Sequence, residues 1–414
     1  NLARPVPGFF LSLPGCLGFS CTAEWAIRRL GMARGAQDFL PLPINLWPAE
    51  TRLLLGLVAT WSVFGLLVLA SASWWVSQQE LGDALYTIKR QLIWMLAGWA
   101  LFSVVVRTPL KRWLQLAAPA LLIGTGFVAL TLIIGTTVNG ASRWLVLGPI
   151  QLQPTELIKP FIVLQGAVLF SQWRRLAVDQ RVLWMAILGG IILLILKQPN
   201  LSTAALTGLV LWLMALASGL PLHWLVGIAG LGLTAGTSSI LINEYQRLRV
   251  TSFLDPWQDP LGHGYQLVQS LLAIGSGGLS GSGYGLSTQK LMYLPIQTTD
   301  FIFAVYAEEF GFVGSVVLLL FLAVFALMGL RVALRSRGNQ VRLVAIGCTT
   351  ILVGQSIMNI AVASGAMPTT GLPLPLVSYG GNSLLASLFI AGLLVRCSLE
   401  SADPLSLSSR PSRS

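Results

Sequence analysis

Long apolar runs alternate with short polar segments along most of this chain. Long stretches contain no Asp, Glu, Lys or Arg, among them residues 182–196, 198–243, 310–330 and 343–395. A helix that crosses a membrane needs about 20 mostly apolar residues, so the second and fourth stretches can each hold two such spans. Because backbone polar groups in lipid must bond within their own segment, each span is predicted to be a helix.

This pattern predicts an all-α polytopic membrane protein. It has about ten transmembrane helices, near residues 53–72, 91–106, 114–135, 157–172, 182–197, 202–218, 222–242, 311–331, 343–363 and 381–396. A large extracytoplasmic loop, about 243–310, lies between the seventh and eighth spans. The spans belong to a membrane domain (51–398), which follows a cytoplasmic N-terminal extension (1–50) and precedes a cytoplasmic tail (399–414).

Composition agrees with the bilayer as the main solvent, since only 10% of residues are charged and 55% are hydrophobic. The net charge of +11 is typical of nucleic-acid partners, but the basic residues lie between apolar runs and form no stripe, so we expect no nucleic acid. With both termini in the cytoplasm, 18 of the 26 Lys and Arg fall inside, as the positive-inside rule requires. Nine of the 15 Asp and Glu fall outside.

The large outside loop carries the residues most suited to chemistry. Asp300 lies where the loop returns to the membrane, and apolar residues follow at once. Partial desolvation there raises a carboxyl pKa and suits Asp300 to act as a general base. The alternative is a helix N-cap at the start of the eighth span. The glycine-rich run 275–285 either brings backbone amides close to an anion or forms a flexible hairpin.

A second outside segment joins the third and fourth predicted spans. Arg143 offers a planar set of donors suited to phosphate, and Trp144 offers an apolar ring at the membrane surface. Glu156 and Lys159 are three residues apart and share a helix face. An interfacial anchor with a local ion pair explains these residues equally well. A third segment, 367–383, has three prolines and predicts a re-entrant or pinned loop.

No residue pattern predicts a metal site. The cysteines lack metal-binding spacing, and we expect no disulfide among Cys16, Cys21, Cys348 and Cys397. The two histidines, His223 and His263, fall on opposite sides of the membrane in this topology.

Seven short motifs resemble, in the same order, those of the SEDS family of bacterial membrane proteins (shape, elongation, division and sporulation). They are residues 140–144 (GASRW), 153–157 (QPTEL), 255–260 (DPWQDP), 264–266 (GYQ), 299–304 (TDFIFA), 307–309 (AEE) and 378–381 (SYGG). Several motifs in one order argue against a chance match. Residues 289–295 and 368–373 are more similar to the division member of the family than to its elongation member.

This resemblance implies a peptidoglycan glycosyltransferase that polymerises lipid II, a disaccharide-peptide on undecaprenyl pyrophosphate. The reaction is expected on the outer face of the plasma membrane, at the division septum. The implied partners are a class B penicillin-binding protein, which cross-links the new strands, and other membrane proteins of the division machinery. By motif position, the catalytic aspartate of the family matches Asp300, its functional arginine and tryptophan match Arg143 and Trp144, and its cavity-lining residues match Glu156 and Lys159.

Three residues depart from the family pattern. Asn200 stands where an aspartate is usual, Thr298 replaces a common histidine, and Asn382 replaces a serine or threonine. Two of these changes remove an ionisable group near the expected site, so tuning of the Asp300 pKa by a neighbouring imidazole is in doubt.

The leaving pyrophosphate is anionic and must meet cations where its charge develops. The outside candidates are Arg143, Lys159, Arg249 and Lys290. A divalent cation is neither required nor excluded by the sequence. Two other functions stay open: a lipid II flippase or ion-coupled carrier, and a non-catalytic scaffold of the division machinery. Coupled transport uses ionisable residues inside the spans, and these spans are nearly bare of charge, which favours surface chemistry.

Overall fold

A computed structural model of the chain describes residues 44–138, 141–148 and 150–402. Most of the expected N-terminal extension (1–50) and of the expected tail (399–414) lies outside the described residues. Two of the cysteines considered above, Cys16 and Cys21, lie outside them as well.

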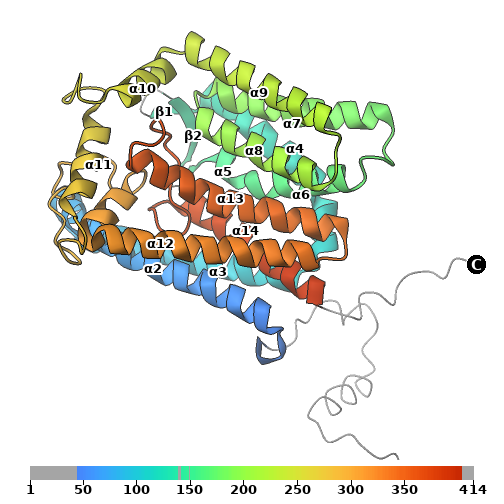
Figure 1. The fold of residues 1–414 in the computed structure, drawn as a ribbon, viewed down its shortest axis with the longest axis horizontal. Helices are drawn as coiled ribbons and strands as arrows, with labels where there is room; N and C mark the ends of the chain where they lie inside the picture. Colours follow the sequence, from blue (N-terminus) through green and yellow to red (C-terminus); the bar gives the residue numbers. More distant parts are fainter. Residues whose placement is uncertain (1–43, 139–140, 149, 403–414) are drawn as a thin grey trace, which may run out of the picture. The chain divides into compact units, whose positions relative to one another are not determined.

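The described part is built almost wholly of helices (Figure 1). They are η1 (Ile44–Leu46), α2 (Ala49–Leu81), α3 (Tyr86–Arg107), α4 (Leu110–Ile134), α5 (Pro154–Leu157), α6 (Lys159–Ser171), α7 (Val178–Lys197), α8 (Leu201–Ala217), α9 (Leu222–Ile242), α10 (Glu244–Leu254), α11 (Tyr265–Ser276), α12 (Ile302–Arg335), α13 (Asn339–Ala363) and α14 (Gly381–Ala402). The prediction of an all-α polytopic membrane protein is confirmed.

Each predicted span falls on one of these helices. Eight helices in the described ranges are long and apolar enough to cross a membrane: α2, α3, α4, α7, α9, α12, α13 and α14. The other two predicted spans correspond to shorter helices, because α6 has 13 residues and α8 has 17. The count of ten membrane crossings therefore stays a prediction.

A small antiparallel sheet lies in the outside segment between α4 and α5, where no strand was expected. Its strands are β1 (Thr136–Val138), β2 (Ala141–Leu147) and β3 (Ile150–Leu152), in the order β1-β2-β3. Thr136 pairs with Trp144 and Leu145 pairs with Leu152. Threonine, valine and tryptophan favour extended backbone, and this local preference prevails once the chain leaves the helices.

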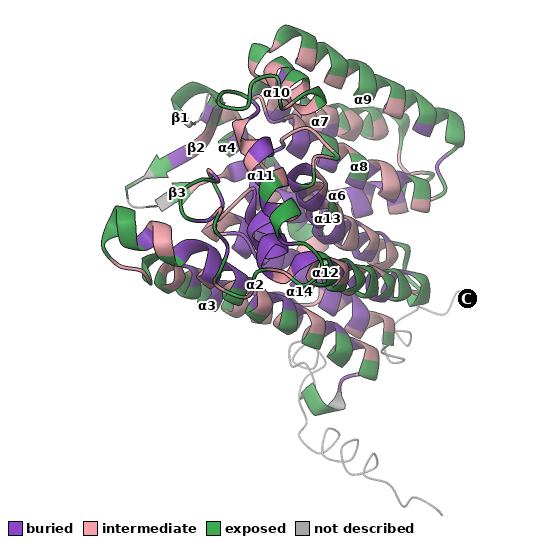
Figure 2. Cartoon of the chain, turned by 60° about the vertical axis from the view of Figure 1, so that its left-hand side comes forward, coloured by how far each residue is buried: buried purple, intermediate pink, exposed green. Residues whose placement is uncertain are grey.

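The centre of the bundle is formed by α14, which packs against α3, α13 and α2. Figure 2 shows buried residues concentrated around α6, α13 and α14, whereas α9 is exposed along most of its length. Within α9 only Leu225 is buried, and apolar residues such as Leu231 and Ile242 are exposed. Apolar surface of this extent suits lipid rather than water.

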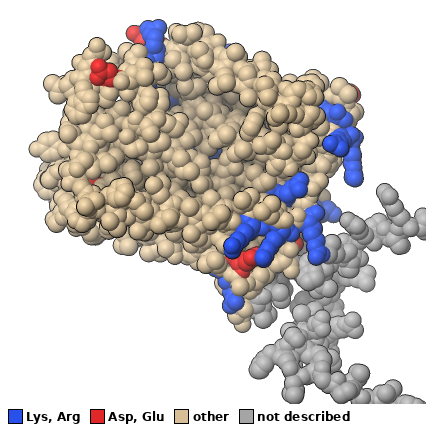
Figure 3. Space-filling view, viewed as in Figure 1, with Lys and Arg blue, Asp and Glu red and all other residues tan. Residues whose placement is uncertain are grey.

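Charged residues are unevenly distributed over the surface. Figure 3 shows Lys and Arg gathered towards the end where α12 turns into α13 and α14 ends, while the middle of the helices is almost free of charge. This is the distribution that the positive-inside rule describes for a cytoplasmic face. The orientation of the protein in a membrane stays a prediction.

The first part of α12 is separated from the rest by a break at Gly311, where φ is 65° and ψ is −162°. The predicted eighth span begins at this break, and the helix itself begins nine residues earlier, at Ile302. The break leaves carbonyl groups without helical partners. The amide of Ser282 donates to the carbonyl of Glu308 at 2.9 Å. The amide of Gly283 donates to the carbonyl of Glu309 at 3.0 Å.

The same glycine-rich run accepts hydrogen bonds from the other side of the break. The amide of Phe312 donates to the carbonyl of Gly278 at 2.9 Å. The amide of Val313 donates to the carbonyl of Leu279 at 3.1 Å. This packing favours the hairpin interpretation of the glycine-rich run over an anion site, and the hairpin is bonded to α12 by its backbone.

A buried ion pair also holds the large loop. Lys290 is 1% exposed, and its ammonium donates to Glu309 at 2.8 Å and to Ser71 of α2 at 3.0 Å. The neighbouring carboxylate of Glu308 accepts from the amide and the hydroxyl of Thr288, at 2.9 and 2.8 Å. Both glutamates of the 307–309 motif therefore bind the loop segment that contains Lys290.

Replacing Gly311 should destabilise the fold. A Cβ at this position would lie 2.4 Å from the amide nitrogen of Gly281, and the backbone angles belong to a region that is almost restricted to glycine. We expect Gly311→Ala to lower the free energy of unfolding by ~1–3 kcal/mol. The measurement is the thermal unfolding midpoint in detergent, which should fall. The matched control is Gly126→Ala in α4, where a Cβ meets no atom within 4 Å. Equal midpoints for the two variants would contradict the proposed role of the break.

Removing one partner of the buried ion pair should destabilise the protein more than removing both. Glu309→Gln leaves the Lys290 ammonium buried without its counter-charge, which typically costs about 3–5 kcal/mol. The double variant Lys290→Met with Glu309→Gln removes both charges and should recover most of that loss. Thermal unfolding of the two variants measures the difference, and a double variant no more stable than the single one would speak against it.

Candidate active site

Three charged side chains from distant parts of the chain converge beside Gly371, in the connection between α13 and α14. The φ angle of Gly371 is +71°. A Cβ at this position would lie 3.6 Å from Oδ2 of Asp300, 3.8 Å from Nη1 of Arg143 and 3.9 Å from Nη1 of Arg249. The absent side chain therefore leaves a small gap between one carboxylate and two guanidinium groups, which we call the Gly371 gap.

Strand β2 carries Arg143, and the α7–α8 connection fixes its guanidinium. Its Nε donates to the carbonyl of Gln198 at 3.2 Å, and its Nη2 donates to the carbonyl of Pro199. The side chain of Gln198 in turn donates to the carbonyl of Val128 in α4. Two nitrogens of Arg143 are thus bound by carbonyls, and Nη1 is the one next to the Gly371 gap.

Helix α10 carries Arg249, and the α13–α14 connection binds it. Its Nη1 donates to the carbonyl of Thr369 at 3.1 Å. Its guanidinium lies 4.5 Å from the ring centre of Tyr245, one turn earlier on the same helix, in a cation–π contact. Both cations near Asp300 are therefore anchored by the protein before any ligand binds.

Asp300 lies two residues before α12 and is partly buried. Burial raises the pKa of its carboxyl above the ordinary value, against the opposing effects of Arg249, Arg143 and a hydrogen bond from Thr299. Neither guanidinium forms an ion pair with Asp300 among the ion pairs of the described residues. The alternative of a helix N-cap is wrong, because Phe301 occupies the cap of α12 and no side chain caps that helix.

Burial also affects Arg143, whose pKa is lowered by loss of hydration and, to a smaller extent, by the charge of Arg249. The nearby Asp300 acts in the opposite direction. Two cations next to each other in partly dehydrated surroundings are stabilised by an anion between them. The two guanidinium groups and the single carboxylate leave a net positive charge beside the Gly371 gap.

Trp144 follows Arg143 on β2 and is partly buried. The pairing of β1 with β2 is irregular at this point, because Thr136 lies opposite Trp144 and Thr137 lies opposite Ser142, so that Arg143 is an extra residue in β2.

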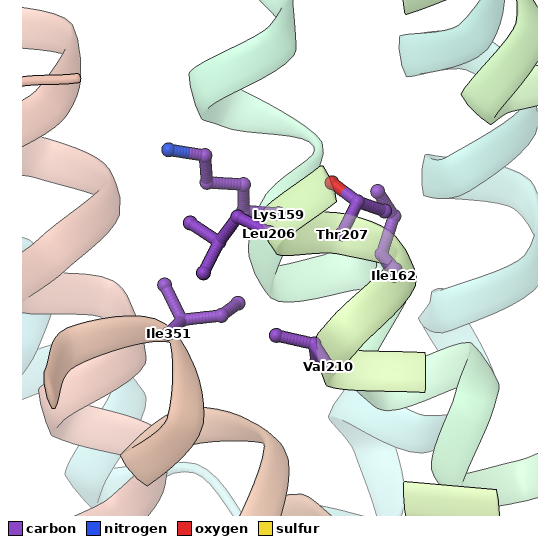
Figure 4. Close-up of a pocket in the computed structure, with 6 residues that line it drawn as sticks. All are labelled: Lys159, Ile162, Leu206, Thr207, Val210 and Ile351. Atoms are coloured by element: carbon purple, nitrogen blue, oxygen red, sulfur yellow. The ribbon is translucent and has the colours of Figure 1, made fainter. Parts of the chain in front are cut away.

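Glu156 and Lys159 lie inside the bundle as an ion pair of 2.6 Å, and each is 3% exposed. Lys159 also donates to Oε1 of Gln355 at 2.8 Å. Figure 4 shows the stem of Lys159 beside a small cavity between α6, α8 and α13, with the ammonium pointing away from its mostly apolar lining. The sequence pattern of a local ion pair is correct, and the pair is buried rather than interfacial.

Apart from Trp144, the predicted site residues therefore fall into two groups. Asp300, Arg143 and Arg249 meet at the Gly371 gap. Lys159 and Lys290, expected to meet a leaving group, are instead held in buried ion pairs with Glu156 and Glu309. A buried ammonium that is already bonded to a carboxylate has little capacity left for a ligand, so charge and side of the membrane alone were insufficient to assign these lysines.

Two residues next to these charged groups, Gly371 and Tyr245, were not among the predicted site residues. The proline-rich composition of 367–375 indicated a pinned loop, but the empty position beside Asp300 depends on a backbone angle that no motif reveals. Tyr245 lies four residues before Arg249, and this spacing could have predicted their contact on one helix face. Two of the departures noted above also have defined positions: Asn200 caps α8 by accepting from the amide of Thr203, and Asn382 donates to the carbonyl of Gln151 in β3.

Known proteins are similar to this chain over most of its length. A protein of Synechocystis sp. named probable peptidoglycan glycosyltransferase FtsW is 53% identical over 358 residues, 86% of this chain and 91% of that protein. A protein of Mesostigma viride named putative peptidoglycan glycosyltransferase FtsW is 46% identical over 354 residues, covering 86% and 85%.

Two solved structures are similar over 84% of this chain and 97% of theirs. One, described as the structural coordination of polymerization and crosslinking by a peptidoglycan synthase complex, has a TM-score of 0.68 and 32% identity. The other, the crystal structure of the Thermus thermophilus rod shape determining protein RodA, has a TM-score of 0.63 and 30% identity. The family profile of cell cycle proteins of the FtsW, RodA and SpoVE type matches residues 51–403. The resemblance carried by the seven motifs is thereby confirmed, and the chain belongs to the FtsW/RodA/SpoVE family of cell cycle proteins.

Proposed function

We propose that this chain is a peptidoglycan glycosyltransferase that polymerises lipid II into glycan strands on the outer face of the plasma membrane. The observation that carries the proposal is the convergence of Asp300, Arg143 and Arg249 at the Gly371 gap. Strands β1 and β2 and helix α10 lie at the end of the bundle away from the gathered Lys and Arg side chains (Figures 1 and 3). The names of the relatives support the same activity.

In the proposed reaction, Asp300 takes the proton from the 4-hydroxyl of the acceptor N-acetylglucosamine. The freed oxygen forms a bond to the anomeric carbon of the donor N-acetylmuramic acid. The bond from that carbon to the lipid pyrophosphate breaks, and the pyrophosphate leaves with the electron pair. A base works best with a pKa near the working pH, so the raised pKa of Asp300 suits this role.

Arg143 and Arg249 are assigned to the negative charge that develops on the leaving pyrophosphate. Both guanidinium groups are fixed by backbone carbonyls in advance, so little reorganisation is needed when the charge appears. Pyrophosphate leaves without protonation, so a single base is sufficient and no second carboxyl group is required. Trp144, the next residue of β2, is assigned to apolar contact at the membrane surface.

The proposal extends to partners and place. A similar solved structure is described as a complex that coordinates polymerization with crosslinking, which supports a class B penicillin-binding protein as partner. Relatives named FtsW support action with other membrane proteins of the division machinery, at the septum. Both termini are then cytoplasmic, as the distribution of Lys and Arg favours.

Replacing the base should abolish polymerisation. Asp300→Asn keeps the size of the side chain and removes its capacity to accept a proton, so we expect turnover of lipid II to fall by ~10²–10⁴-fold. The measurement is polymerisation by the purified protein with its penicillin-binding partner. Asp83→Asn, which removes an exposed carboxylate paired with Lys89, is the matched control and should retain activity.

Equal polymerisation by Asp300→Asn and wild type would exclude Asp300 as the base. If neither forms polymer while lipid II crosses vesicle membranes that contain the protein, the flippase interpretation is correct. If the protein only raises cross-linking by its partner, it is a scaffold.

The fall in activity at acid pH should reflect the protonation of Asp300. The base works only when deprotonated, so turnover should fall as pH drops through the raised pKa, with a midpoint above 3.8. Because Arg249 lowers this pKa, Arg249→Gln should move the midpoint to higher pH. Arg247→Gln, an exposed cation on the same helix, is the control and should leave the midpoint unchanged. A downward shift in Arg249→Gln would contradict the assignment.

A further inference from the structure

The backbone that leads to Asp300 is fastened at three successive carbonyl groups. The amide of Tyr379 donates to the carbonyl of Thr298 at 2.8 Å. The hydroxyl of Ser378 donates to the carbonyl of Thr299 at 2.6 Å. The side-chain amide of Asn359 donates to the carbonyl of Asp300 at 2.8 Å. The residue proposed as base is thus held from α13 and from the segment before α14, and not by its own helix.

Asn359 differs from the other two donors because it binds the backbone of Asp300 and also the backbone next to Gly371. Its Nδ2 donates to the carbonyl of Leu372, also at 2.8 Å. Leu372 is the residue directly after Gly371. One amide nitrogen, on a side chain that is 1% exposed, therefore joins the backbone of the base to the backbone of the gap.

The hydrogen-bonding chemistry fixes the orientation of this amide. Both partners of Asn359 are carbonyl groups, which only accept, so the NH₂ group must face them. Its Oδ1 is then buried without a partner. An unsatisfied buried oxygen is unfavourable, so packing alone does not account for this side chain. This arrangement favours a positional role over a purely structural one.

Helix α13 carries a second amide one turn earlier, which shows how specific the contact of Asn359 is. Nε2 of Gln355 donates to the carbonyl of Pro373 at 2.8 Å, and its Oε1 accepts from Lys159. Gln355 thus binds the α13–α14 connection but not Asp300, and both polar atoms of its amide have partners. Asn359 supports that connection and Asp300 together.

We propose that Asn359 is a positioning residue that sets the separation between the Asp300 carboxylate and the Gly371 gap, and with it the alignment of the base and the acceptor hydroxyl. This inference rests on the proposed function. A side chain with this role acts on turnover rather than on substrate binding, since it holds the reacting groups in register and leaves the lipid and peptide contacts in place.

The test compares Asn359→Ala with Ser356→Ala in lipid II polymerisation by the full chain with its partner. Ser356 is equally buried on the same helix, but its hydroxyl donates only to the carbonyl of Leu352, one turn back. A displacement of about 1 Å can lower a rate ~10²-fold, so we expect Asn359→Ala to reduce kcat roughly 10- to 100-fold. KM should change less than about twofold, and Ser356→Ala should retain wild-type kcat.

The pH profile provides a readout that a merely structural role would not move. The charged and titratable groups around Asp300 are Arg143 on β2 and Arg249 and Tyr245 on α10. If loss of Asn359 lets Asp300 shift from between the two guanidinium groups, the acid limb of kcat moves to higher pH in Asn359→Ala. The acid limb of Ser356→Ala should coincide with that of wild type.

A second variant covers the case in which Asn359→Ala does not fold. Asn359→Ser leaves one hydroxyl, which can donate to one carbonyl but not to both, and should show an intermediate loss of kcat. A folded variant with wild-type kcat and an unmoved acid limb overturns the inference. Failure of both variants to fold also overturns it, because Asn359 is then required for the fold itself.

The Asp300→Asn variant separates the two hypotheses. If Asp300→Asn polymerises like wild type, the proposed function of Asp300 fails, whatever Asn359 does. If Asp300→Asn is inactive and Asn359→Ala is fully active, only the inference about Asn359 fails.

Discussion

Polar groups carried into an apolar bundle must find their partners within the protein, and the candidate site depends on how this requirement is met. Two buried ammonium groups, those of Lys159 and Lys290, are each bound to a glutamate. The carbonyls and amides freed by the break at Gly311 are bound by the glycine-rich hairpin. Arg143 and Arg249, by contrast, form no ion pair among the described residues and lie beside Asp300 at the Gly371 gap.

Much of the architecture could be predicted because lipid imposes a simple rule on sequence. Stretches without charge gave the positions of ten helices, and the motifs gave the family and Asp300. The sequence did not show that both lysines are buried in ion pairs, because it gives the sign of a charge and not its partner. Their role towards a substrate stays a prediction. Lys290 and Glu309 are 19 residues apart, and their pairing depends on the break in α12. For the same reason Asn359, one polar residue within an apolar run, gave no signal.

The departures from the family pattern are compatible with the fold for distinct reasons. Asparagine caps helices about as well as aspartate does, so Asn200 keeps the start of α8 without adding a charge near Arg143. The backbone carbonyl of Thr298 accepts a hydrogen bond from the amide of Tyr379, and this bond does not require a particular side chain at position 298. Desolvation and the two arginines, rather than an imidazole, then determine the pKa of Asp300.

A break in a transmembrane helix is commonly regarded as a hinge, but the break at Gly311 has the opposite mechanical consequence. Bending α12 there would have to rupture the four backbone hydrogen bonds described above, which join it to the glycine-rich hairpin. The hairpin therefore stabilises the orientation of the two parts of α12 on either side of Gly311. A tilt of the part of α12 that follows Gly311 would therefore be carried through to residues 302–310 and to the loop bound to them.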